Sequence, residues 1–351
     1  MSTTAAPAPF LAQRLKRKHF FCNADVHIQG DVLIATQLVV GGDLLVDGDL
    51  EAEEVFCLGK LTVTGNIHVQ SLYVGQALDG GGNIAVAYLL KTGCSAEWMA
   101  RMLELDQTNP KPGSNYLDRL VHPAILQRNA EHAHLLGGLG DIQALGHLAC
   151  DDLDAQGNVQ LDDALLAGEV LYIGGHLSAR AIQVAGDCNC QGEVFCETDI
   201  AADGALFAAS LAVEGNLAAA SIHCSGNIAT WGYLRATGEI SSLNGEIDCA
   251  RWIASKSTLY AAKYIKAGEA VVAEQGISAG KDYGILAGTA LPRSDWEAAG
   301  FVSAKDKPRH ILSGLFVADK KLKQLDALEK KRDWELDWEI PRRLEREAMQ
   351  G

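Results

Sequence analysis

Hydrophobic and polar positions alternate over short stretches through most of the chain, and glycine separates one stretch from the next. Leu61-Thr62-Val63-Thr64 and Leu211-Ala212-Val213-Glu214 are typical. Alternation places successive side chains on opposite faces of an extended segment, so it predicts short strands with one apolar face. Between stretches stands Gly, then a polar residue, then an aliphatic one, as in Gly42-Asp43-Leu44. The pattern therefore predicts strands joined by tight corners.

The corners recur at a nearly fixed spacing. Gly48, Gly65 and Gly82 are 17 residues apart, and Gly168 and Gly186 are 18 apart. Within a period the gaps alternate between about 6 and 11 or 12 residues, which describes three short sides. One coil cannot bury its own apolar face, so neighbouring coils must stack. We predict an all-β dominated fold, a three-sided parallel β-helix (β-solenoid) of about 17–18 residues per coil. Glycine is expected at the corners because it tolerates positive φ.

Helical spacing replaces the repeat over residues 94–136. Ser95 stands where it can cap the N-terminus of a helix, and Trp98, Met99 and Met102 follow at helical intervals. Insertions in solenoids fall in loops on one face, which is often the binding face. We therefore predict a helical insertion in which Trp98, Met102 and Tyr116 either contact a partner or pack on the coils.

The two flanks of the chain also depart from the repeat. Near the C-terminus Leu322, Leu325 and Leu328 form a helical seam, and Trp334 and Trp338 are an i,i+4 pair. Open solenoid ends expose unpaired backbone, so both flanks are expected to cap the coils, the alternative being a detached tail that binds something else. The predicted organisation is an N-terminal cap (1–24), a first coil region (25–93), the helical insertion (94–136), a second coil region (137–290) and a helical C-terminal cap or tail (291–351).

The net charge of −15 is concentrated in the centre of the chain. Residues 25–290 hold 33 acids against 13 Lys or Arg, and between 129 and 234 Arg180 stands alone against 14 acids. Such a surface repels nucleic acid and anionic membranes, and it either favours a basic partner or serves solubility. Residues one coil apart lie above each other, so part of the set is expected to form an acidic stripe. The acidic candidates for partner binding are Asp151, Asp152, Asp154, Asp162, Asp163, Glu169, Asp187, Glu193, Glu197 and Asp199.

The nine cysteines are scattered and odd in number. No apolar core of a signal peptide precedes them, and no run approaches the ~18 apolar residues of a membrane span. We expect free thiols in a reducing cytoplasm. Cys188-x-Cys190 with Cys196 is a weak metal pattern that two inward-facing core thiols explain equally well. Neither a metal nor a cofactor is predicted.

Motifs of catalysis are missing from the sequence. It contains no Walker A motif, no Gly-x-Ser-x-Gly, no His-Glu-x-x-His and no paired Cys-x-x-Cys. In a hexapeptide-type acyltransferase the catalytic base would be a histidine, here one of His68, His147, His176 and His223. The sequence shows no partner for any of them, so we expect no enzymatic activity.

Two stretches carry a resemblance to a known family. Gly42-Asp43-Leu44-Leu45-Val46-Asp47-Gly48-Asp49-Leu50 and Val184-Ala185-Gly186-Asp187-Cys188-Asn189-Cys190-Gln191-Gly192 resemble the repeats of bactofilins, over roughly two thirds of the chain. The resemblance implies a bacterial, cytoplasmic, non-enzymatic protein that forms polymers from one uninterrupted coil stack between disordered tails. This chain departs from that pattern in its longer stack, its helical insertion and its C-terminal flank.

Acid surplus, missing catalytic motifs and predicted caps together favour a binding protein. The leading hypothesis is a cytoplasmic bacterial protein that binds a basic protein partner, most concretely an immunity protein that inhibits a cationic toxin such as a nuclease. The alternatives are a bactofilin-like structural polymer and, third, a hexapeptide-type acyltransferase. No nucleic acid and no membrane is expected as a partner, and homo-oligomerisation is left open.

Overall fold

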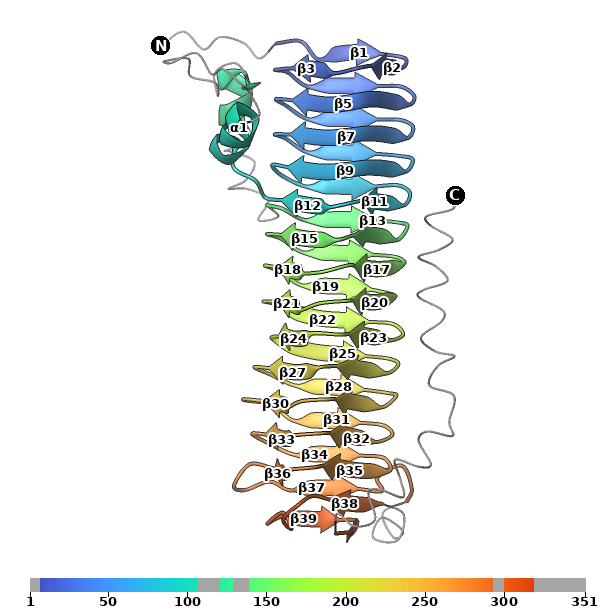
Figure 1. Cartoon of the computed structure of the whole chain (residues 1–351), viewed down its shortest axis with the longest axis vertical. Coiled ribbons are helices and arrows are strands. Elements are labelled where there is room, and N and C mark those ends of the chain that lie inside the picture. Colours follow the sequence, from blue (N-terminus) through green and yellow to red (C-terminus); the bar gives the residue numbers. More distant parts are fainter. Residues whose placement is uncertain (1–6, 106–119, 129–138, 293–299, 319–351) are drawn as a thin grey trace. The chain divides into compact units, whose positions relative to one another are not determined.

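The structure, a computed structural model, describes residues 7–105, 120–128, 139–292 and 300–318. These residues form a mostly β parallel β-solenoid of about 16 turns with two short helices (Figure 1). The chain divides into two compact units. Unit 1 comprises residues 1–180 and 190–192, and unit 2 comprises residues 181–189 and 193–351.

Unit 1 is built from three parallel ladders. The ladders run β1-β4-β6-β8-β10-β13-β16-β19, β2-β5-β7-β9-β11-β14-β17 and β3-β5-β7-β9-β12-β15-β18. Leu44 pairs with Leu61 and Leu61 with Leu78, each 17 residues on, which confirms the predicted period. A second short helix covers residues 123–128. The other elements of unit 1 are β1 (Phe10–Ala12), β2 (Leu15–Arg17), β3 (Phe20–Cys22), β4 (Val26–Ile28), β5 (Val32–Val40), β6 (Leu44–Val46), β7 (Leu50–Cys57), β8 (Leu61–Val63), β9 (Ile67–Val74), β10 (Leu78–Gly80), β11 (Ile84–Val86), β12 (Leu89–Thr92), α1 (Ala96–Leu105), β13 (Ile142–Ala144), β14 (Leu148–Cys150), β15 (Asp152–Ala155), β16 (Val159–Leu161), β17 (Ala164–Ala167), β18 (Leu171–Ile173) and β19 (Leu177–Ala179).

Unit 2 repeats this arrangement. Its ladders run β22-β25-β28-β31-β34-β37-β39, β20-β23-β26-β29-β32-β35-β38-β40 and β21-β24-β27-β30-β33-β36. The strands are β20 (Ala181–Val184), β21 (Cys188–Cys190), β22 (Glu193–Cys196), β23 (Ile200–Ala202), β24 (Ala205–Ala208), β25 (Ser210–Val213), β26 (Leu217–Ala219), β27 (Ser221–Cys224), β28 (Ile228–Thr230), β29 (Leu234–Ala236), β30 (Ile240–Ser242), β31 (Ile247–Cys249), β32 (Ile253–Ser255), β33 (Thr258–Ala261), β34 (Ile265–Ala267), β35 (Ala270–Ala273), β36 (Gly276–Ser278), β37 (Ile285–Ala287), β38 (Phe301–Ser303), β39 (Ile311–Ser313) and β40 (Leu315–Phe316).

The core follows from the alternation read in the sequence. In β6 and β8 the first and third side chains are buried and the middle one is partly exposed. Leu44, Leu61 and Leu78 stack directly above one another in the interior. Each such leucine contributes roughly 1.5–3 kcal/mol relative to an exposed one. The interior is therefore a column of aliphatic rungs repeated once per turn.

The corner glycines serve a different purpose from the one predicted. Among the described residues, positive φ is confined to Gly93, Gly140, Gly288 and Gly314, so the expectation of left-handed corners is wrong for most of them. The reason for glycine is close approach between turns. A Cβ on Gly65 would lie 2.8 Å from the carbonyl carbon and oxygen of Gly48 and would also collide with Asp49 Oδ1. Real Cβ atoms do not come so close to backbone.

Where an Asp or Asn follows the corner glycine, its side chain bonds to the neighbouring turn at many of the corners. The backbone amide of Asn66 donates to Asp49 Oδ1 (2.7 Å), and the backbone amide of Asn83 donates to Asn66 Oδ1 (3.0 Å). The same bond joins Asn158 to Asp141 (2.7 Å). A backbone donor that would otherwise be unpaired at the corner is satisfied in this way. The repeated Gly-Asp or Gly-Asn pair is thus a stacking device, in which glycine makes room and the next side chain makes the bond.

The flanks differ in part from the prediction. Residues 10–22 form β1, β2 and β3, which pair in parallel with β4 and β5, so the coil begins before residue 25. Strands β38, β39 and β40 lie in the segment 291–351, which the sequence pattern assigned to helices. The helices predicted from residue 319 onward lie outside the described residues.

Candidate functional site

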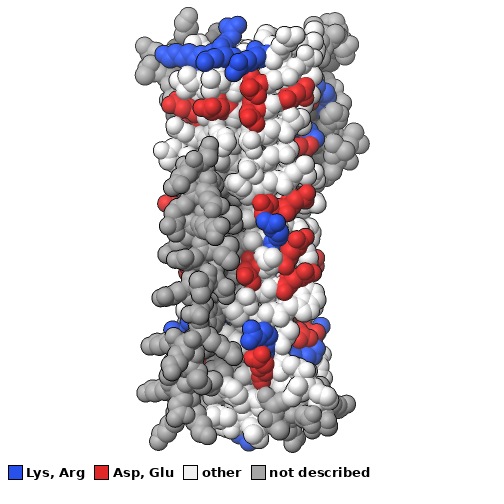
Figure 2. Space-filling model, turned by 90° about the vertical axis from the view of Figure 1, so that its right-hand side faces the viewer, with Lys and Arg blue, Asp and Glu red and all other residues white. Residues whose placement is uncertain are grey.

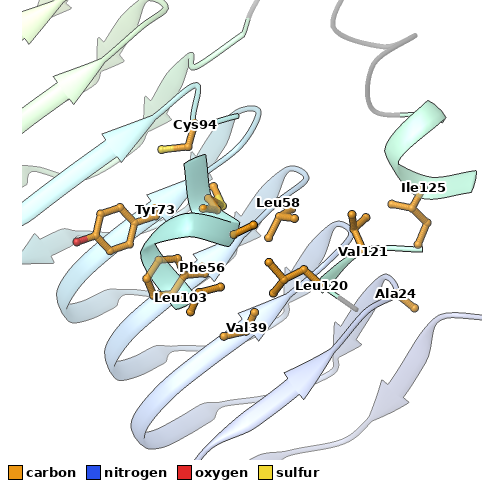
Figure 3. Packing of buried hydrophobic residues seen from close by; sticks show 12 residues of the cluster. Ala24, Val39, Phe56, Leu58, Tyr73, Cys94, Leu103, Leu120, Val121 and Ile125 are labelled. Carbon is orange, nitrogen blue, oxygen red and sulfur yellow. The ribbon is translucent and has the colours of Figure 1, made fainter. Parts of the chain in front are cut away.

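The insertion packs on one wall of unit 1. Met99 of α1 is fully buried, and Leu103 nearly so, in a cluster with Phe56 of β7 and Tyr73 of β9. The rings of Phe56 and Tyr73 stack with their centroids 4.6 Å apart. Figure 3 shows Leu103 beside Phe56, and Leu120 and Val121 continuing the cluster toward Ala24. The strand positions that α1 covers face outward, so their apolar side chains are explained by the helix.

An arginine clamp fixes the second helix of the insertion. Arg128 donates from Nη1 to Asp25 Oδ2 (2.7 Å) and from Nη2 to Asp25 Oδ1 (3.0 Å), and Nη2 lies 3.2 Å from Asp43 Oδ2. Burial raises the pKa of Asp25, but the hydrogen bonds from Arg128 and the Asp43 amide outweigh it and the net pKa is lowered. The same hydrogen bond to Asp25 raises the pKa of Arg128. Both groups are therefore charged in the folded protein near neutral pH.

A short chain of contacts joins α1 to the acidic candidates. Trp98 lies 5.6 Å from Tyr73 between ring centroids, and the Lys91 ammonium lies 5.7 Å from the Trp98 ring. Lys91 also forms an ion pair with Asp154, its partner in the parallel register of β12 and β15. Gln156 Nε2 donates to the other Asp154 oxygen (2.7 Å). Trp98 and Asp154, 56 positions apart by 154 − 98, thus belong to one surface.

A surface pocket of about 500 Å³ opens beside this chain of contacts. Val170 on its wall is 49% exposed, and the Tyr172 hydroxyl accepts a hydrogen bond from Gln191 Nε2 (2.6 Å). Asp152 Oδ1 accepts from the Val170 amide (3.2 Å), which holds its carboxylate at the rim. The lining combines apolar side chains with a few fixed polar groups, and the pocket is open to the surface. The lining residues are Leu89, Asp152, Leu153, Asp154, Gln156, Val170 and Tyr172.

The remaining candidates are distributed over several places. Asp151 lies at the corner between β14 and β15, and Glu169 at the corner between β17 and β18, both next to the pocket strands. Asp162 and Asp163 lie at a different corner, between β16 and β17, where Asp163 pairs with Arg180. Figure 2 shows acidic side chains in several separate groups on one face, not in one continuous stripe. In unit 2 lie Asp187, Glu193, Glu197 and Asp199.

Two of the unit 2 candidates have a structural role. Asp187 Oδ1 accepts from the Ala205 amide (2.7 Å), and Asp199 Oδ1 accepts from the Asn216 amide (2.6 Å). These aspartates belong to the corner ladders, so their presence is explained without a partner. Of the insertion candidates, Met102 is 36% exposed, and Tyr116 lies outside the described residues.

The four histidines do not meet in one site. Burial lowers the pKa of His147, and nearby His68 adds to that, against an opposing attraction to Asp163. His176 lines a second, smaller pocket with Asp141 and Asn158. His223 lies on β27 in unit 2, within 2.9 Å of Ser241 Oγ and 3.1 Å of Ser221 Oγ. The acyltransferase alternative gains no support from their placement.

All nine cysteines are free thiols, and all but Cys22 are buried. Cys188, Cys190 and Cys196 point inward at alternate strand positions. Burial raises the pKa of Cys190 to about 11 and that of Cys196 to about 12. Among the described residues no group of three or more His, Cys, Asp or Glu is arranged to hold a metal ion.

The sequence pattern missed three residues of this region. Lys91 and Tyr172 become neighbours of the candidate Asp154 only through the parallel register. Arg128 reaches Asp25 and Asp43, which are not among the candidates, only through the folding back of the insertion. Lys91 could have been noticed as a cation on a strand position followed directly by the insertion. No sequence signal identifies Tyr172.

Comparisons with known proteins found no matching family model, no similar curated protein and no similar solved structure. In the described part of the chain, no helix has the length and apolar character needed to cross a membrane. The fold and the pocket on unit 1 are therefore the basis for assigning a function.

Proposed function

We propose that this chain is a non-enzymatic binding protein that holds a basic protein partner at the pocket of unit 1 beside the insertion. The single observation that carries the proposal is that pocket, which is lined by Asp152 and Asp154 together with apolar side chains. Lys91, which pairs with Asp154, also lies over the Trp98 ring of α1. The acidic surplus of the sequence, 33 acids against 13 cations over residues 25–290, supports a positively charged partner.

The local charge balance supports the same partner class. Asp151, Asp152, Asp154 and Glu169 give four negative charges, and Lys91 gives one positive charge, a balance of −3. A lysine or arginine side chain placed among these carboxylates gains charge-assisted hydrogen bonds of roughly 1.5–3 kcal/mol each. Its aliphatic stem would cover Leu89 and Val170, which line the same pocket. An uncharged partner would leave the local surplus of negative charge uncompensated.

The most concrete form of the proposal is an immunity-type inhibitor of a cationic toxin, for example a nuclease effector, acting in the bacterial cytoplasm. Electrostatic attraction accelerates the association of such pairs by 10-fold to 1000-fold, an advantage for an inhibitor that must act before its target does. Solubility alone would not require carboxylates at the rim of a pocket.

A bactofilin-like scaffold is the second proposal, and the observation that favours it is the parallel β-solenoid itself. Solenoid turns have open backbone edges at their ends and can add further copies there. Both proposals assume that each turn has three sides, with one row of outward-facing side chains on each ladder. Negative-stain microscopy separates them, because filaments at micromolar concentration favour the scaffold, and discrete particles favour the binder. Binding of an acyl donor would favour the third alternative, an acyltransferase.

Two matched charge variants test the binding proposal. The pocket variant carries Asp152→Asn in the pocket lining and Asp151→Asn and Glu169→Gln beside it, and Asn at position 152 keeps the oxygen that accepts from the Val170 amide. The control carries three exposed acids of unit 2, changed as Asp203→Asn, Glu214→Gln and Glu274→Gln, with the same change in net charge. Each protein is used to capture partners from native cell lysate. Capture of one basic protein by the wild type and the control but not by the pocket variant supports the proposal. Equal capture by all three, or no basic protein, counts against it.

A further inference from the structure

The first turn of unit 1 is basic. Its strands β1, β2 and β3 and the corners between them carry the cations Arg14, Lys16, Arg17 and Lys18, all of them exposed. Residues 7–24 contain no acid. Figure 2 shows Lys and Arg side chains gathered at this end of unit 1, apart from the groups of acids. Residues 10–22 are called the charged end turn below.

The charged end turn also presents open sheet edges. Strand β1 pairs with β4, and β2 and β3 pair with β5, each on one side only. In the part of the chain that the structure describes, no strand pairs with their other side. Such an edge leaves a row of backbone donors and acceptors that a further strand can join. A second copy of the chain could therefore stack on this turn unless something prevents it.

One cation of the charged end turn occupies a position that belongs to the core. Arg17 is paired in register with Ile34, and the same column continues through Ala52, Val69 and Val86. These four apolar side chains are at most 7% exposed, whereas Arg17 is exposed. The column thus ends with a guanidinium at the position where the next turns have an apolar side chain. A turn stacked on Arg17 would enclose that guanidinium at the end of an apolar column.

We propose that the charged end turn prevents a second copy of the chain from joining its strands to β1, β2 and β3. Lysine on an edge and a charged side chain at an inward position are two means by which sheet proteins avoid edge-to-edge pairing. Stacking would remove Arg17 from water, and no ion pair among the described residues includes it. Where two such turns meet, Lys16 and Lys18 of both copies also repel each other.

The inference goes beyond the proposed function, because it concerns the first turn of unit 1 and not the pocket. It stands whether or not a basic protein binds beside the insertion. It also bears on the scaffold alternative, since a polymer that grows at this end needs β1, β2 and β3 to accept strands of a further copy. A chain whose first turn excludes further copies cannot grow from that end.

The test compares three full-length proteins by analytical ultracentrifugation and by hydrogen exchange with mass spectrometry. The end variant carries Lys16→Gln, Arg17→Ile and Lys18→Gln, in which isoleucine matches Ile34 of the next turn. The control carries Lys256→Gln, Lys263→Ile and Lys281→Gln, three exposed lysines of unit 2, with the same change in net charge. The end variant is expected to self-associate at least roughly 100-fold more tightly than the wild type, because no unpaired cation is buried on joining. Exchange in β1, β2 and β3 should slow as it associates, since their edge amides become bonded.

The wild type and the control should show no concentration-dependent protection of these three strands. Protection of β1, β2 and β3 in the wild type as its concentration rises would overturn the proposal. An end variant that stays monomeric, or that associates without protecting the three strands, would overturn it as well. Unchanged exchange in β7 and β9 shows that the substitutions leave the coil intact. If exchange there is faster, Arg17→Ile alone replaces the end variant, and the same outcomes decide.

Discussion

Replacing a corner glycine by alanine should destabilise the solenoid through a collision between neighbouring turns. At Gly65 an added Cβ would lie 2.8 Å from both the carbonyl carbon and the carbonyl oxygen of Gly48, and it would also overlap Asp49 Oδ1. A backbone neighbour cannot rotate away as a side chain can, so the two turns must separate locally. Gly276 in β36 is the matched control, because a Cβ there would meet nothing within 4 Å and its φ is not positive.

The magnitude at Gly65 can be worked out from the contacts. Overpacking of this kind costs roughly 1–3 kcal/mol. Separation of the turns also weakens two bonds, from the Gly65 amide to Gly48 O (3.1 Å) and from the Asn66 amide to Asp49 Oδ1 (2.7 Å). Each is worth roughly 0.5–1.5 kcal/mol. If both bonds are lost, Gly65→Ala should therefore cost about 2–6 kcal/mol. Gly276→Ala should change stability little, or raise it by up to about 1 kcal/mol because alanine restricts the unfolded chain.

Hydrogen exchange is the suitable assay, because a stack of repeats need not unfold in a single step. Gly65→Ala should speed exchange in β6, β7, β8 and β9, the strands that flank the Gly48 and Gly65 corners, and Gly276→Ala should leave exchange unchanged. Adding Asp49→Ala removes the side-chain overlap but also the acceptor of the Asn66 backbone amide, and the contacts with the Gly48 backbone remain, so protection should not return to the wild-type level. Equal effects of the two alanines, or no effect at Gly65, would refute close approach as the reason for the glycine repeat.

Three further predictions concern the insertion, its clamp and the thiols. Met99→Ala should destabilise the docking of α1 by about 2–5 kcal/mol, seen as faster exchange of its amides, while Met102→Ala should stay within about 0.5 kcal/mol. Arg128→Ala should lower the free energy of unfolding by roughly 1–3 kcal/mol near neutral pH. Because the pKa of Asp25 is lowered from 3.8 in the folded protein, this difference between wild type and variant is fully present above 3.8 and shrinks as the pH falls below it. Chemical denaturation at a series of pH values measures it. Burial raises the pKa of Cys224 to about 12, so at pH 8 iodoacetamide should label it by mass spectrometry far more slowly in the folded than in the denatured chain.

The fold was predictable from the periodicity of the sequence, because stacked turns repeat the same inward and outward positions once per turn. The offset of 17 residues between Leu44 and Leu61 is readable from the sequence and equals the strand register. The reason for the corner glycines was not readable. Close approach depends on where Gly48 lies relative to Gly65 in space, whereas positive φ is the commoner reason for glycine in turns.

The site was predictable only in part. An acid surplus is visible in the composition, but the sequence does not reveal that Asp152 and Asp199 both bond to the next turn, or that Asp152 also lines a pocket. The ion pair of Lys91 with Asp154 joins residues 63 positions apart, because the insertion interrupts the repeat between them. A period counted along the chain loses its register across such an insertion, and only the parallel pairing of β12 with β15 restores it.

The claim that a basic protein binds at the unit 1 pocket is tested most directly by the affinity of the purified partner for three proteins, the wild type, the pocket variant and the unit 2 control, at low and high salt. Loss of three carboxylates at the contact, at roughly 1 kcal/mol each, predicts about 100-fold weaker binding for the pocket variant, little change for the control, and a steep fall of the wild-type affinity with salt. An affinity that is indifferent to salt, or that falls equally in both variants, would contradict the assignment of the pocket as the binding site.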